Sequence, residues 1–198
     1  MRVVAGRLTK CLSGLWGVGM TAIVGLARGG SVFIGGDSAG VSGMNLAVRA
    51  DTKVFRKGRY LFGFTTSFRM GQLIRYSLAM PKPKGDLDAF MATKFVDALR
   101  NCLKSGGWAR KEDDREEGGT FLVGVRGQLF TVYEDYQVGR AADGFAAVGC
   151  GDQIALGALY ATARTGMKPR ARIKVALGAA ERFSAGVRGP FVCMALRQ

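Results

Sequence analysis

The order of strand-like and helix-like segments along the chain is the strongest constraint on its fold. Period-two and β-rich segments cover 21–27, 31–37, 60–66, 120–125, 128–133, 145–148 and 191–196. Helical spacing of apolar residues covers 67–80, 87–103, 152–165 and 170–184. Strands, two helices, strands, two helices and a last strand predict the α+β class. Two antiparallel sheets enclosed between helix pairs, a four-layer αββα sandwich, are the simplest packing of that order.

The size of the chain suits one such domain. It has 198 residues, of which 48% are hydrophobic, enough for a sizeable core. The segment 105–119 carries five of the 15 acidic residues and is bracketed by glycines. We interpret this segment as an exposed loop within the domain rather than a linker between domains.

The absence of histidine restricts the chemistry. Ser-His-Asp and Cys-His mechanisms are excluded, so a nucleophile would need an amine, a carboxylate or a lysine to activate it. The four cysteines form no C-x-x-C pair and, without histidine, do not assemble the usual zinc patterns, so no metal and no cofactor is expected. Their sparse distribution favours a reducing, cytoplasmic setting.

The chain is strongly basic, with a net charge of +14. Such a charge attracts nucleic acid, acidic lipid or acidic protein without specifying one of them. A basic nucleic-acid-binding protein is therefore a rival hypothesis. Against it, no nucleic-acid-binding motif occurs and the aromatic residues lie in apolar runs rather than among arginines, so we expect no nucleic-acid partner.

The N-terminal segment has two interpretations. Basic residues precede an uncharged run over 11–27, the layout of a signal peptide or of a short membrane span. Four glycines and the lack of a cleavage motif argue against both, and we expect no membrane association. Met20 stands directly before Thr21. Residues 1–20 are therefore predicted to be a propeptide or an over-long extension, and 21–198 the functional domain.

Thr21 would carry its own base if it were the first residue. An α-amino group has a reference pKa of about 7.7–8.0, so near neutral pH it can accept the hydroxyl proton. A nearby lysine would lower the pKa of that amine, and a carboxylate would hold the lysine charged and in place. Asp37 and Lys53 are the candidates for these two roles.

The chain resembles the N-terminal-nucleophile (Ntn) threonine peptidases, meaning proteasome β-type subunits and especially the bacterial HslV-type subunit. The T-A-I-V opening at Thr21, the G-D pair ending at Asp37 and the lysine at Lys53 match the family's motifs, 16 and 32 residues after the threonine. "GMNLAVRADTKV" at 43–54 and the Gly-Cys-Gly turn at 149–151 extend the similarity.

The resemblance implies further site residues. Thr66 would donate its backbone N–H to the oxyanion, although the family has a glycine in that turn. Cys150 stands where the family has a serine beside the threonine amine. Thr65 and Asp51 would line the substrate pocket, and Asp51 would favour basic substrate side chains.

The resemblance also implies a function. The chain would be a threonine-type endopeptidase subunit of a homo-oligomeric, self-compartmentalising ring that cleaves peptides or unfolded proteins, with a ring ATPase unfoldase as partner. The alternatives are a small-amide hydrolase or an inactive ring subunit of the same fold.

Overall fold

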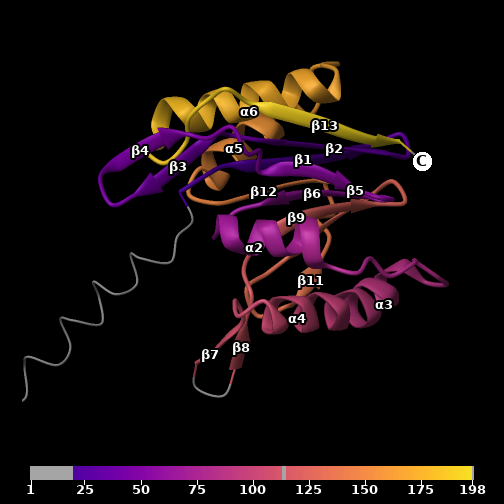
Figure 1. The fold of residues 1–198 in the computed structure, drawn as a ribbon. Helices are drawn as coiled ribbons and strands as arrows, with labels where there is room; N and C mark the ends of the chain where they lie inside the picture. The colour runs from indigo at the N-terminus through magenta and orange to yellow at the C-terminus, as the bar shows by residue number, and fades with distance from the viewer. Residues whose placement is uncertain (1–19, 113–114, 198) are drawn as a thin grey trace, which may run out of the picture.

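Two antiparallel sheets form the centre of the molecule in the computed structural model, which describes residues 20–112 and 115–197 (Figure 1). The first sheet has the spatial order β12 (Phe145–Val148), β1 (Ile23–Arg28), β2 (Ser31–Gly36), β13 (Val192–Arg197). The second has the order β11 (Val138–Gly139), β10 (Gln128–Val132), β9 (Phe121–Val125), β6 (Tyr60–Phe64), β5 (Val54–Lys57).

Helices cover the outer face of each sheet, as Figure 1 shows. The first sheet is covered by α5 (Asp152–Ala161) and α6 (Pro169–Phe183). The second is covered by α2 (Phe68–Gln72) with its π-helical continuation η2 (Leu73–Ser77), and by α3 (Leu87–Phe90), η3 (Met91–Phe95) and α4 (Val96–Ser105). The predicted α+β, four-layer αββα order is confirmed.

Alternation along β1 explains why this strand lies in the middle of the sandwich. Val24 and Leu26 pack into the core beneath α5 and α6, whereas Ile23 points into the core between the sheets. All three are buried. Burying such a side chain stabilises the fold by about 1.5–3 kcal/mol, so β1 anchors two of the three cores at once.

Two short hairpins were not predicted. The first joins β3 (Ala39–Ser42) to β4 (Asn45–Val48), and all four residues of β4 are exposed, so no alternation marked it as a strand. The second, β7 (Arg110–Glu112) with β8 (Arg115–Glu117), lies in the segment expected to be a loop. Its register places basic positions opposite acidic ones.

The predictions for the N-terminal segment fall almost entirely outside the described residues, since only Met20 of residues 1–20 is described. In the part of the chain that the structure describes, no helix is both long enough and apolar enough to span a bilayer.

Candidate active site

The strand order brings three distant residues to one end of the sandwich. Ile23 in β1 pairs with Gly36 in β2, so Thr21, just before β1, and Asp37, just after β2, lie at the same end of the hairpin. Lys53 directly precedes β5 of the opposite sheet. A Cβ on Gly36 would lie 2.7 Å from the Ile23 side chain, so glycine permits the close approach at this point.

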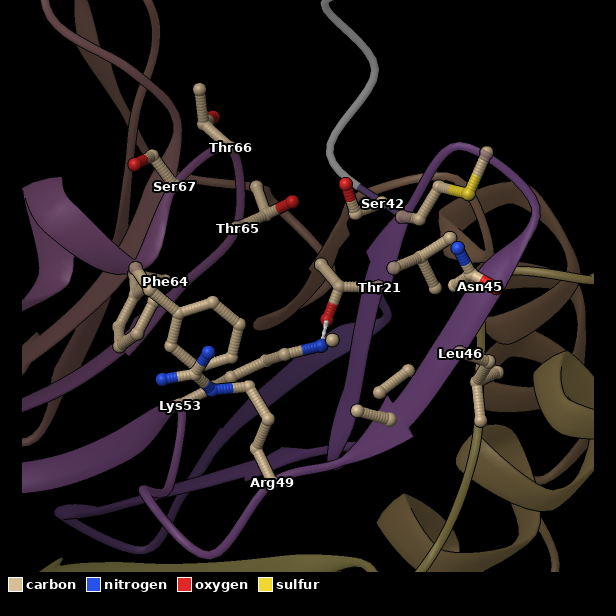
Figure 2. Close-up of a pocket in the computed structure, with 16 residues that line it drawn as sticks. Thr21, Ser42, Asn45, Leu46, Arg49, Lys53, Phe64, Thr65, Thr66 and Ser67 are labelled. Carbon is tan, nitrogen blue, oxygen red and sulfur yellow. Dashed lines mark hydrogen bonds between the residues drawn. The ribbon is translucent and has the colours of Figure 1, made fainter.

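Thr21, Asp37 and Lys53 form a buried hydrogen-bonded network. The Thr21 hydroxyl donates to Asp37 Oδ1. The Lys53 ammonium donates to the Thr21 Oγ, as Figure 2 shows. Lys53 Nζ also lies 2.8 Å from Asp37 Oδ1. The three residues are at most 3% exposed, so little water screens these contacts. The structure therefore brings together the three residues that the sequence spacing singled out.

Backbone donors fix the carboxylate of Asp37. Oδ1 accepts from the N–H of Ala22 at 3.1 Å, and Oδ2 accepts from those of Ala39 at 2.8 Å and Arg188 at 3.3 Å. Hydrogen bonds to a carboxylate are stronger than neutral ones. Asp37 is thereby held in a fixed orientation that sets the position of Lys53. The backbone N–H of Arg188, 151 residues away, was not foreseeable from any motif.

Burial lowers the pKa of Lys53, while the Asp37 carboxylate opposes that change. The result is an amine that stays close to the hydroxyl and gives up a proton more readily than a solvated lysine. Such a group can stabilise negative charge on Thr21 Oγ and take part in proton transfer.

Thr21 opens onto a cavity of about 470 Å³, shown in Figure 2. Thr65 and Thr66, both expected to belong to the site, line it on the side opposite the β3–β4 hairpin. Thr66 has φ = 66°, in the left-handed region where a β-branched residue costs about 1–3 kcal/mol. Its Oγ1 accepts from the Thr120 N–H at 3.1 Å, which holds the turn in place. A glycine would adopt this conformation without strain.

Cys150 contacts the backbone of Thr21 rather than its hydroxyl. Its Sγ lies 3.5 Å from the Thr21 carbonyl oxygen and 3.3 Å from Ser184 Oγ. The neighbouring Gly149 has φ = 103°, and a Cβ there would lie 2.4 Å from the same carbonyl oxygen. Ser184, which caps the end of α6, was missed by the sequence analysis. Its only signal was a serine after the last helix.

Asp51 does not line this cavity in the described structure. It lies beside a separate cavity of about 40 Å³ and forms a bidentate ion pair with Arg49. Arg49, which the sequence analysis did not select, lines the large cavity instead. The wall that was expected to carry a carboxylate therefore presents a guanidinium.

Two sheets between helix layers, with a threonine before the first strand, define the fold of the proteasome-type Ntn-hydrolases. BPH of Thiobacillus denitrificans superposes with a TM-score of 0.76 at 23% identity, covering 89% of this chain and 98% of that one. A complex of BPH with epoxomicin gives the same score at 22% identity, again covering 89% and 98%.

Two further solved structures share the fold. HslV of Trypanosoma brucei has a TM-score of 0.66 at 18% identity, covering 90% of this chain and 100% of that one. Anbu of Yersinia bercovieri has a TM-score of 0.63 at 13% identity, covering 89% and 82%. No protein-family model and no curated protein matches the sequence.

Proposed function

We propose that this chain is a threonine-type endopeptidase subunit of a proteasome-like, self-compartmentalising protease. The contact of the Thr21 hydroxyl with both Asp37 and Lys53 at the edge of a peptide-sized cavity is the observation that carries the proposal. The chain contains no histidine that could activate the hydroxyl. Among the described residues, Asp37 and Lys53 are the charged side chains that form hydrogen bonds with it. The shared fold of BPH and HslV supports the same reaction class.

The reaction is acyl transfer to the threonine. The free amine of Thr21 takes the hydroxyl proton while Oγ attacks the peptide carbonyl carbon, giving a tetrahedral oxyanion. Thr66 lines the cavity, and its backbone N–H would donate to that oxyanion. The amine then returns the proton to the leaving nitrogen as the peptide bond breaks, and water hydrolyses the threonine ester to regenerate the hydroxyl.

The amine must first be released by breaking the Met20–Thr21 bond. Met20, on one side of this bond, is 46% exposed and lines the cavity, whereas Thr21 on the other side is buried. Removal of residues 1–20 by self-cleavage, or of an initiating Met20, would expose the base and enlarge the cavity. Cys150 contacts the backbone carbonyl of Thr21 next to this amine, Ser184 contacts Cys150 in turn, and the two would help to position the amine.

Assembly into a closed ring is part of the proposal. The β3–β4 hairpin projects from the sandwich in Figure 1 and exposes Met44, Leu46 and Val48. Exposed apolar residues of this kind are typical of surfaces covered in an assembly. A homo-oligomeric ring fed with unfolded protein by a cytoplasmic ring ATPase would confine the site. Sedimentation velocity of the purified chain at micromolar concentration would test the ring, since a monomer contradicts it.

Intact mass spectrometry tests the function directly. We expect the wild type to lose residues 1–20 and to gain the mass of one β-lactone or epoxomicin molecule on the fragment that begins at Thr21. Thr21→Ala should remain unlabelled. Ser42→Ala is the matched control, because Ser42 also presents a hydroxyl to the cavity but contacts neither Asp37 nor Lys53 in the described structure (Figure 2). Equal labelling of Thr21→Ala and the wild type would refute the assignment. Labelling without peptide cleavage would favour a small-amide hydrolase.

A further inference from the structure

We propose that Arg49 makes the cavity beside Thr21 selective for acidic side chains of the substrate. This inference rests on the proposed peptidase function and names its substrate class. Of the described residues that line the cavity, Arg49 and Lys53 carry ionisable side chains, and both are cations. Lys53 is bound to Thr21 and Asp37, which leaves Arg49 as the cation that can face a substrate group.

The guanidinium of Arg49 is held in place from two directions. Its Nε and Nη2 donate to the two carboxylate oxygens of Asp51, both at 2.7 Å. Its Cζ lies 3.9 Å from the centroid of the Phe68 ring, in a cation–π contact. The rigid fork of an arginine keeps this geometry with little further loss of entropy on binding. The charge is therefore positioned before a substrate arrives.

Donor capacity remains on the guanidinium of Arg49. Nη1 makes no hydrogen bond within the described residues, and a guanidinium carries five N–H donors, of which Asp51 takes two. The Arg49 side chain is 39% exposed, so a ligand can reach it. Figure 2 shows it on the same side of the cavity as Lys53, and the Phe68 ring lies near both cations. A substrate carboxylate can thus accept a charge-assisted hydrogen bond from Nη1.

Asp51 acts here as a positioning residue. Its hydrogen bond raises the pKa of Arg49, while the pKa of Asp51 itself is lowered by the same contact. The Asp51 carboxylate lines the separate small cavity, whereas Arg49 lines the large one, so a basic substrate side chain in the large cavity would meet Arg49. In both ion pairs, Arg49–Asp51 and Lys53–Asp37, the cation lines the cavity and the carboxylate does not. The expected order of preference is acidic, then neutral, then basic.

Paired reporter peptides test this order. Three peptides differ only in the residue before the scissile bond, which is Glu, Gln or Arg. Glu and Gln have nearly the same shape, so the ratio of their kcat/KM values reports the effect of the charge. Because both values come from the same preparation, the ratio does not depend on the amount of active enzyme. We expect the wild type to favour Glu over Gln by about fivefold, the upper range for one exposed ion pair. The Arg peptide should be the poorest.

Substitutions separate Arg49 from general charge. Arg49→Gln should bring the Glu-to-Gln ratio to about one, and Arg49→Lys should keep part of it. The matched control is Arg56→Gln, which removes the same charge from an exposed arginine of β5 and should leave the ratio unchanged. A wild-type ratio near one, or an unchanged ratio in Arg49→Gln, would overturn the proposal. A preference for the Arg peptide that disappears in Asp51→Asn would instead assign Asp51 as the contact.

Binding distinguishes this inference from the function on which it rests. The Kd values of the Glu and Gln peptides are measured by isothermal titration calorimetry on Thr21→Ala, with and without Arg49→Gln. Tighter binding of the Glu peptide that depends on Arg49 supports the inference even when no variant cleaves any peptide. In that case the peptidase proposal fails alone. Equal binding of both peptides to Thr21→Ala removes the selectivity, whatever the cleavage results show.

Discussion

Two ion pairs whose cations line the cavity differ mainly in their burial. Lys53 and Asp37 are 2.8 Å apart, with side chains 3% and 0% exposed. Arg49 and Asp51 are 2.7 Å apart, with both side chains 39% exposed. The separations are nearly equal and the two cations are four residues apart in the chain. Distance alone therefore does not rank the two pairs.

Burial gives the pairs different roles. Inside the protein, the attraction between charges is strong, but each charge has lost its water and depends on its partner. The Lys53–Asp37 pair is thus fixed and suited to hold a nucleophile. At the surface, water and salt replace much of a lost partner. The Arg49 guanidinium can therefore add a substrate carboxylate to the contact it already has.

The largest effect is expected from breaking the buried pair. Lys53→Met leaves the Asp37 carboxylate buried without its cation, which should lower the free energy of unfolding by about 3–5 kcal/mol. Loss of the group beside Thr21 Oγ should reduce reporter turnover by about 10²- to 10⁴-fold. Urea unfolding and steady-state kinetics measure the two changes. Arg56→Gln again serves as control, and a Lys53→Met variant as stable and active as this control would contradict the comparison.

A smaller effect is expected in the pH dependence of stability. Burial lowers the pKa of Lys53 from its ordinary value of 10.5, so between the folded-state pKa and 10.5 the unfolded chain binds more protons than the folded one. This residue therefore makes the free energy of unfolding rise with pH in that window. Below the folded-state pKa both states are protonated and its contribution is constant.

Comparison of variants isolates that slope. Denaturant unfolding of the wild type and Lys53→Met at a series of pH values up to 10.5 gives their stability difference. The difference should change in favour of the wild type as pH rises through the window. Asp37→Asn removes the carboxylate that opposes the lowered pKa, so the window should extend to lower pH. A stability difference that does not change with pH would show that the pKa of Lys53 is not lowered in the folded protein. Arg49 should give no such slope, because contact with Asp51 raises its pKa.

The layers and the buried pair could be predicted because both depend on local patterns. Strands β1, β2 and β6 show apolar runs, and the helices show apolar residues at helical spacing. Strand β5 was not predicted, because two of its four residues are basic. Thr21 precedes β1 and Asp37 follows β2. The two-residue turn between these strands sets their register, and this register brings the two residues close together. Lys53 precedes the strand that faces this hairpin across the core. Its place followed from the family spacing rather than from any single element.

The exposed pair could not be predicted in the same way. Asp51 was expected in the pocket because of its position in the family alignment. Whether Asp51 or Arg49 lines the cavity depends on the conformation of the segment that follows β4. Phe68, from the start of α2, supplies the ring over which the guanidinium lies. That contact joins residues from separate elements through side-chain packing. No periodicity encodes it, and β4 itself lacks the alternation that would reveal its orientation.

The smallest expected effect is the coupling between Arg49 and Asp51. A double-mutant cycle with Arg49→Gln and Asp51→Asn should give a coupling energy of at most about 1 kcal/mol, because solvent screens both groups. At 1 M salt the Debye length is about 3 Å, so this coupling should nearly vanish. The matching cycle with Lys53→Met and Asp37→Asn should retain most of its larger coupling, since salt does not reach that pair. If salt weakened the two couplings equally, burial would not distinguish the Lys53–Asp37 pair from the Arg49–Asp51 pair. The different roles assigned to Lys53 and Arg49 would then be wrong.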